Sequence, residues 1–151
     1  MKTILAAVDS SNTSESVVVE AAELARTTNG RIVLLTIVQP PVITSEYAPA
    51  LDNVAEITAA SEKAAARHLE KLSAQLERDG IATETAQDIG VPVVQILEHA
   101  RKKAADYIVM GSHGHTAFYD LLVGSTTHGV LLRAPCPVLI VPPKEKKKSR
   151  G

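Results

Sequence analysis

One segment of the sequence concentrates residue types that bind anions. It joins three glycines to three hydroxyl side chains: Gly111, Gly114 and Gly124, then Ser125, Thr126 and Thr127. Glycines let the backbone approach an anion closely, and successive amides there form an anion-binding nest. If a helix begins near the third glycine, its first free amides and the positive end of its dipole point toward the same anion. The segment therefore predicts a phosphate-binding site.

The charge of this segment implies a metal ion beside the phosphates. No lysine falls between Gly111 and Thr127, so a bound Mg²⁺ or Mn²⁺ would be needed to neutralise the remaining negative charge of the phosphates. Two common phosphate motifs are absent, because nothing matches G-x-x-x-x-G-K-[ST] and no G-x-G-x-x-G follows the first strand. Alternatively, the glycines only close a turn and cap a helix. The run of hydroxyls favours the phosphate site.

Three histidines near this segment raise the alternative of a metal centre: His113, His115 and His128. Zinc would need further ligands, and no cysteine or paired carboxylate beside them supplies these. Histidines of surface loops are therefore the favoured interpretation, and the ligands of any metal ion stay unassigned.

Strand and helix patterns alternate along the chain. Short apolar or alternating runs predict strands at residues 4–8, 31–38, 81–87, 106–110 and 138–141. Helical spacing predicts helices from the capping box of Asn12 and Glu15 to Asn29, and over 56–79, 92–103 and most of 120–132. Residues 39–55 contain three prolines and predict a loop that acts as a lid.

This order of elements predicts an α/β fold with one doubly wound, five-stranded parallel sheet and helices on both faces. The strand order would be 3-2-1-4-5. Ligands of such sheets bind beyond the carboxyl ends of the strands, where the winding reverses. The strand ends at Asp9 and Gly111 therefore become candidate parts of one site.

The length and the net charge of the chain limit the kinds of protein that it can be. The 151 residues suit one domain, expected at 1–143, followed by a basic flexible tail at 144–151. With 16 basic and 17 acidic residues, no global field favours nucleic acid or a membrane, and the tail is expected to be solvated. The first apolar run is too short for a signal peptide or a membrane span, which predicts a cytoplasmic protein.

The spacing Gly111-x2-Gly114-x9-Gly124-Ser125 resembles the nucleotide-binding type of the universal stress protein family. The resemblance extends from ILAAVD through GRIVLLTIV, DIGVPVVQIL and ADYIVMGSHG to RAPCPVLIVP, which is nearly the whole chain. It implies that the anion is the phosphate group of an adenine nucleotide, ATP by preference, with ADP or AMP as alternatives.

The resemblance also assigns roles to residues of this chain. It places Asp9 against the ribose hydroxyls and the backbone of Ile37 against the adenine edge. Ala7, Val8 and Met110 would line the base and the sugar. The phosphates would be surrounded by Gly111, His113, Gly114, Gly124, Ser125, Thr126 and Thr127. A carboxylate at Asp9 suits a diol, although the same residue could instead cap the first helix.

These features predict an ATP-binding stress-response or signalling module whose contacts with an unknown regulatory partner depend on nucleotide occupancy. A slow, metal-dependent ATP hydrolase and a nucleotide-free interaction protein remain alternatives. Hydrolysis is expected to be secondary, because no arginine finger or lysine is apparent at the phosphates. The last strand, between Pro137 and Pro142, would lie at a sheet edge and predicts a homodimer; a covered or solvated edge in a monomer is the alternative.

Overall fold

Parallel strands form one sheet in the order β3-β2-β1-β4-β5 in the computed structural model, which describes residues 1–41, 51–112 and 123–144. The strands are β1 (Lys2–Ala7), β2 (Gly30–Val38), β3 (Thr83–Ile89), β4 (Tyr107–Gly111) and β5 (Val138–Val141). The helices are α1 (Thr13–Thr28), α2 (Leu51–Arg78), α3 (Pro92–Lys102) and α4 (Ser125–Arg133). The predicted fold class and strand order are confirmed.

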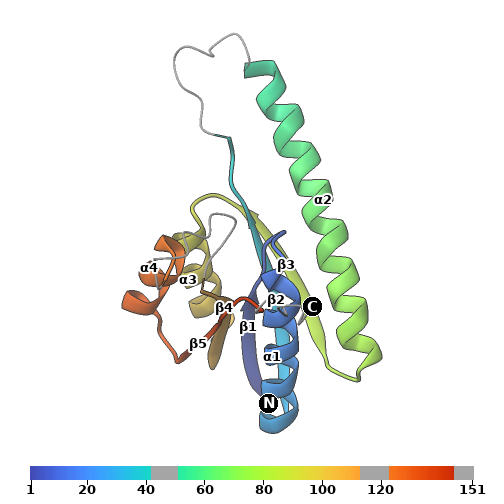
Figure 1. Ribbon diagram of the computed structural model, residues 1–151, viewed down its shortest axis with the longest axis vertical. Coiled ribbons are helices and arrows are strands. Elements are labelled where there is room, and N and C mark those ends of the chain that lie inside the picture. Colours follow the sequence, from blue (N-terminus) through green and yellow to red (C-terminus); the bar gives the residue numbers. More distant parts are fainter. Residues whose placement is uncertain (42–50, 113–122, 145–151) are drawn as a thin grey trace, which may run out of the picture.

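Helices cover both faces of the sheet (Figure 1). Successive side chains of the central strand β1 point to opposite faces, as the period of a strand requires. Ile4 therefore joins a core cluster with residues of α1 and α2, whereas Leu5 joins a second cluster with residues of α3 and α4. Both side chains are fully buried. The two clusters hold the carboxyl ends of the strands at one edge of the molecule.

The helix α2 begins earlier than its sequence pattern predicted. It starts at Leu51 rather than at residue 56, so the expected lid over 39–55 is too long. Pro49 is the last residue of that stretch that a helix interior would exclude, and the residues after it can adopt helical geometry. Residues 42–50 of the expected lid lie outside the described residues.

The start of α1 does not use the predicted capping box. Asn12 has helical dihedrals, with φ −63° and ψ −18°, and its side chain makes no capping hydrogen bond. The Ser14 amide instead donates to the Ser11 carbonyl at 3.2 Å, and the Ser11 amide donates to Asp9 Oδ1 at 2.8 Å. The side chain that organises this turn is therefore Asp9, whose Oδ1 accepts from the Ser11 amide ahead of α1 rather than from an amide of the first helical turn.

The edge strand β3 carries an ion-pair cluster. Glu84 accepts hydrogen bonds from Lys103 and from Arg31, the latter with an N–O distance of 3.2 Å. The hydrogen bond from Lys103 is the main reason that the pKa of Glu84 lies below its usual value. Charges along an edge discourage pairing with another chain. None of the helices within the described ranges has the length and apolar character of a membrane span.

A close contact between α3 and α4 yields a first prediction. A Cβ added at Gly129 would lie 2.9 Å from Val93 Cγ2, a distance at which one group must move. In a helix interior, replacing glycine by alanine ordinarily gains about 1 kcal/mol. We expect Gly129→Ala to change the free energy of unfolding more favourably, by about 1 kcal/mol, in a Val93→Ala background than in the parent chain. Urea unfolding of the four variants measures this coupling, and equal effects in both backgrounds would contradict the contact.

Candidate functional site

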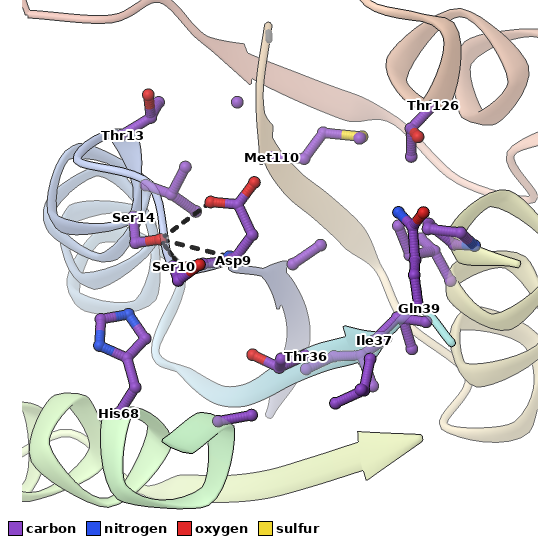
Figure 2. Close-up of a pocket in the computed structure, with 18 of the residues that line it drawn as sticks. Asp9, Ser10, Thr13, Ser14, Thr36, Ile37, Gln39, His68, Met110 and Thr126 are labelled. Atoms are coloured by element: carbon purple, nitrogen blue, oxygen red, sulfur yellow. Dashed lines mark hydrogen bonds between the residues drawn. The ribbon is translucent and has the colours of Figure 1, made fainter. Parts of the chain in front are cut away.

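A cavity of about 750 Å³ lies at the carboxyl edge of the sheet, within the usual size range of ligand pockets (Figure 2). It extends beyond the ends of β1, β2 and β4, and α1, α2 and α4 contribute to its walls. Most of the described residues that the sequence assigned to the site line it: Ala7, Asp9, Ile37, Met110, Gly111, Gly124, Ser125, Thr126 and Thr127. Segments far apart in the chain therefore meet here.

Other assigned residues do not line this cavity or fall outside the description. Val8 is buried, its amide donates to the Leu35 carbonyl at 2.9 Å, and its carbonyl accepts a hydrogen bond from Thr36 Oγ1 at 3.0 Å. It therefore stabilises the strand ends beneath the cavity. His113 and Gly114 lie outside the described residues, and so does His115.

The amino-terminal end of α4 faces the cavity. Gly124 is extended, with φ −69° and ψ 163°, and the helix starts at the next residue. A helix was predicted over most of 120–132, and within the described residues it starts at Ser125. A phosphate site at the first amides of this helix requires such a start beside Gly124. Because the first amides of a helix have no partner within it, they can donate to a ligand.

The three hydroxyls of α4 do not play the same part. Thr127 is buried, and its Oγ1 donates to the Gly111 carbonyl at 2.9 Å, which ties α4 to the end of β4. Ser125 is exposed and Thr126 is partly exposed in the cavity wall. Ser125 and Thr126 can therefore donate to a ligand, whereas the Thr127 hydroxyl holds the wall in place.

A network of hydrogen bonds fixes Asp9. Ser14 is 2% exposed, and its Oγ donates to the Asp9 carbonyl and accepts from the Asp9 amide at 3.2 Å. Together with the amide of Ser11, these contacts hold the turn after β1. Figure 2 shows the Asp9 carboxylate projecting from this turn toward the space between Thr13 and Met110. The carboxylate is thus positioned to accept hydrogen bonds from a ligand.

The backbone of Ile37 also points to the cavity. The register of β1 with β2 ends where Ala7 lies opposite Leu35, although β2 continues to Val38. The Leu35 carbonyl bonds the Val8 amide on the β1 side, and backbone groups two residues apart in a strand point the same way. The amide and carbonyl of Ile37 therefore point past the end of β1, where a ligand can pair with them.

Sequence reasoning missed the wall that α2 supplies. It consists of Ser61, Ala64, Ala65 and His68. The pattern had identified α2 only as a covering helix, because three of its leucines follow one apolar face. The available signal was that this face changes to small and polar residues toward the start of the helix. Asp9 and His68 are the only ionisable side chains among the described residues that line the cavity.

The described residues contain no group of three or more His, Cys, Asp or Glu side chains that could hold a metal ion. The exposed His128 on α4 is not part of the cavity wall.

Comparison with known proteins identifies the family. The model of the universal stress protein family matches residues 1–142. The chain belongs to the universal stress protein family. Among curated relatives, the universal stress protein YxiE of Bacillus subtilis is 30% identical over 144 residues, which cover 91% of this chain and 97% of YxiE.

Solved universal stress proteins have the same fold. The UspA protein of Lactobacillus plantarum superposes with a TM-score of 0.83 at 24% identity and covers 93% of this chain and 97% of its own. The protein of Archaeoglobus fulgidus in complex with dAMP superposes with a TM-score of 0.65 at 22% identity, and the match covers 93% and 98%.

The turn at Asp9 yields a second prediction, with a matched pair of serines on α1. Ser14→Ala should lower the free energy of unfolding by about 1 kcal/mol, since it removes the hydroxyl that bonds the Asp9 backbone. Ser16 is also buried, but its Oγ has no hydrogen-bond partner among the described residues, so Ser16→Ala should be nearly neutral. Urea unfolding compares the two, and a larger loss for Ser16→Ala would contradict the network.

Proposed function

We propose that this universal stress protein is an ATP-binding stress-response and signalling module of the cytoplasm, whose contacts with a regulatory partner depend on nucleotide occupancy. The observation that carries the proposal is the meeting of Asp9, the backbone of Ile37 and the first turn of α4 around one cavity. This cavity includes the carboxyl ends of β1 and β4, the neighbouring strands from which the chain winds in opposite directions. Doubly wound sheets bind their ligands at this position.

Each wall suits one part of an adenine nucleotide. The first amides of α4 with Ser125 and Thr126 would bind the phosphates, and the dipole of the helix would favour their charge. Asp9 would accept hydrogen bonds from the two ribose hydroxyls, and the backbone of Ile37 would pair with the base. The bound dAMP of the Archaeoglobus fulgidus protein, which has the same fold, supports this ligand class.

Further phosphate contacts would come from the part of the glycine segment that lies outside the described residues. His113 and Gly114 would surround the phosphates together with Gly111. A Mg²⁺ or Mn²⁺ ion would be held by phosphate oxygens and would offset the charge, because the described lining residues include neither lysine nor arginine. ADP or AMP could replace ATP, since the base and ribose contacts are common to all three.

A third prediction tests nucleotide binding. ATP with Mg²⁺ should raise the melting temperature, because a ligand that binds only the folded state stabilises it by about 2.7 kcal/mol at a hundredfold excess over Kd. Gly124→Val should abolish this shift, because its side chain would occupy the phosphate volume, while its extended backbone accepts valine without strain. His128→Val, on the exposed side of the same helix, should keep the shift.

The outcomes distinguish the three functions considered. Absence of a shift in the parent chain at millimolar ATP would contradict the proposal and favour the nucleotide-free interaction protein. Steady release of ADP from the same mixture, lost in Gly124→Val, would favour the slow hydrolase.

We also propose that two copies associate through β5. This strand lies at the sheet edge, and its Leu139 is 40% exposed. An apolar edge strand offers unpaired backbone groups to another chain, and the prolines that flank it limit how far pairing can extend. A twofold contact between two copies would cover this edge and close the assembly.

A fourth prediction tests this dimer. Leu139→Lys should shift the mass in light scattering from that of a dimer toward the 16.0 kDa of one chain, because like charges would meet across the twofold axis. Leu139 is a better probe than Ile140, which packs against the core, so folding and association can be separated. A parent chain that scatters as a monomer at tens of micromolar would contradict the interface.

A further inference from the structure

The cavity continues under α2, beyond the residues assigned to phosphate and ribose. The buried face of α2 consists of Leu69, Leu72 and Leu76, which are at most 3% exposed. Toward the start of the helix, small side chains replace these leucines, and Ser61 and Ala65 line the cavity. Since small side chains cannot fill the distance between the helix and the sheet, they leave a slot between α2 and β2.

The opposite wall of this slot is mostly apolar. Val17 of α1 and Thr36 and Val38 of β2 line it, and all three are buried. The hydroxyl of Thr36 is occupied, because it donates to the Val8 carbonyl at 3.0 Å. An apolar slot with few polar groups fits a flat ring better than a phosphate, which would need donors on several sides.

His68 supplies the polar group of this slot. Its Nε2 is shielded from solvent and has no hydrogen-bond partner among the described residues. A buried polar atom without a partner carries a cost that a ligand can remove. In Figure 2 the ring extends from α2 on the side of Ser10 and Ser14, whereas Thr126 lies at the opposite side of the cavity. His68 is thus remote from the phosphate end of the cavity.

We propose that the base of the bound nucleotide enters the slot between α2 and β2 and that His68 hydrogen-bonds its edge. This inference rests on the proposed function and adds a residue that determines specificity for the base. A neutral imidazole offers one donor and one acceptor, and adenine presents ring nitrogens that accept and an amino group that donates. The imidazole supplies this bond from the α2 side of the slot, while the backbone of Ile37 pairs with the base from the sheet.

The experiment compares AMP with ribose 5-phosphate, which carries a hydroxyl in place of the base. The ratio of their dissociation constants, measured by calorimetry, isolates the contribution of the base. His68→Leu should reduce this ratio about tenfold, since it removes the hydrogen bond but retains the bulk of the side chain. His68→Gln should restore most of it, because the amide nitrogen can take the place of Nε2. The control His128→Leu removes an exposed histidine outside the cavity and should leave the ratio unchanged.

A second variant tests the slot itself. Ala65→Leu extends the leucine face of α2 into the slot and should weaken AMP while leaving ribose 5-phosphate unchanged. An unchanged ratio in both His68→Leu and Ala65→Leu, with AMP still bound by the parent chain, would overturn this inference alone. Equal losses for both ligands in His68→Leu would place the histidine at the ribose or the phosphate and also overturn it. A parent chain that binds no adenine nucleotide would overturn the proposed function as well.

Discussion

The site depends on the early end of the central strand. β1 ends at Ala7, whereas its neighbour β2 runs on to Val38. A strand that ends early leaves backbone N–H and C=O groups of its neighbour without a partner in the sheet. When such groups are buried, they need a different hydrogen-bond partner. The hydrogen bonds of Asp9 with Ser11 and Ser14 turn the chain away from the sheet and into α1. The cavity occupies the space that this turn leaves.

Residues from both faces of the sheet line the cavity. Ala7, Ile37 and Met110 belong to the face that α3 and α4 cover, whereas Val17 belongs to the face covered by α1 and α2. A ligand at the carboxyl edge can therefore contact both layers of the fold.

Stability and binding make different demands on the same elements. Large aliphatic residues fill both faces of β1, and their burial supplies the main driving force for folding. At the carboxyl edge the chain adds glycine, serine, threonine and alanine to the aliphatic residues, and these small side chains leave room for a ligand. Thr127 shows how the two demands are reconciled, since its hydroxyl bonds the Gly111 carbonyl and fixes the wall beside the free amides of α4.

The sequence by itself determined the fold class and the glycine and hydroxyl segment, because alternating periods and β-branched runs are local signals. The predicted strand order also agrees with the structure, although local signals alone do not distinguish it from other orders of doubly wound sheets. It did not determine the start of α2 or the cap of α1, where several residues compete for the same backbone groups and packing decides between them. Only the tertiary structure brought His68 to the cavity and separated Val8 from it. Those positions depend on how far one helix lies from one strand, and this distance is set by side chains from all over the core rather than by any local pattern.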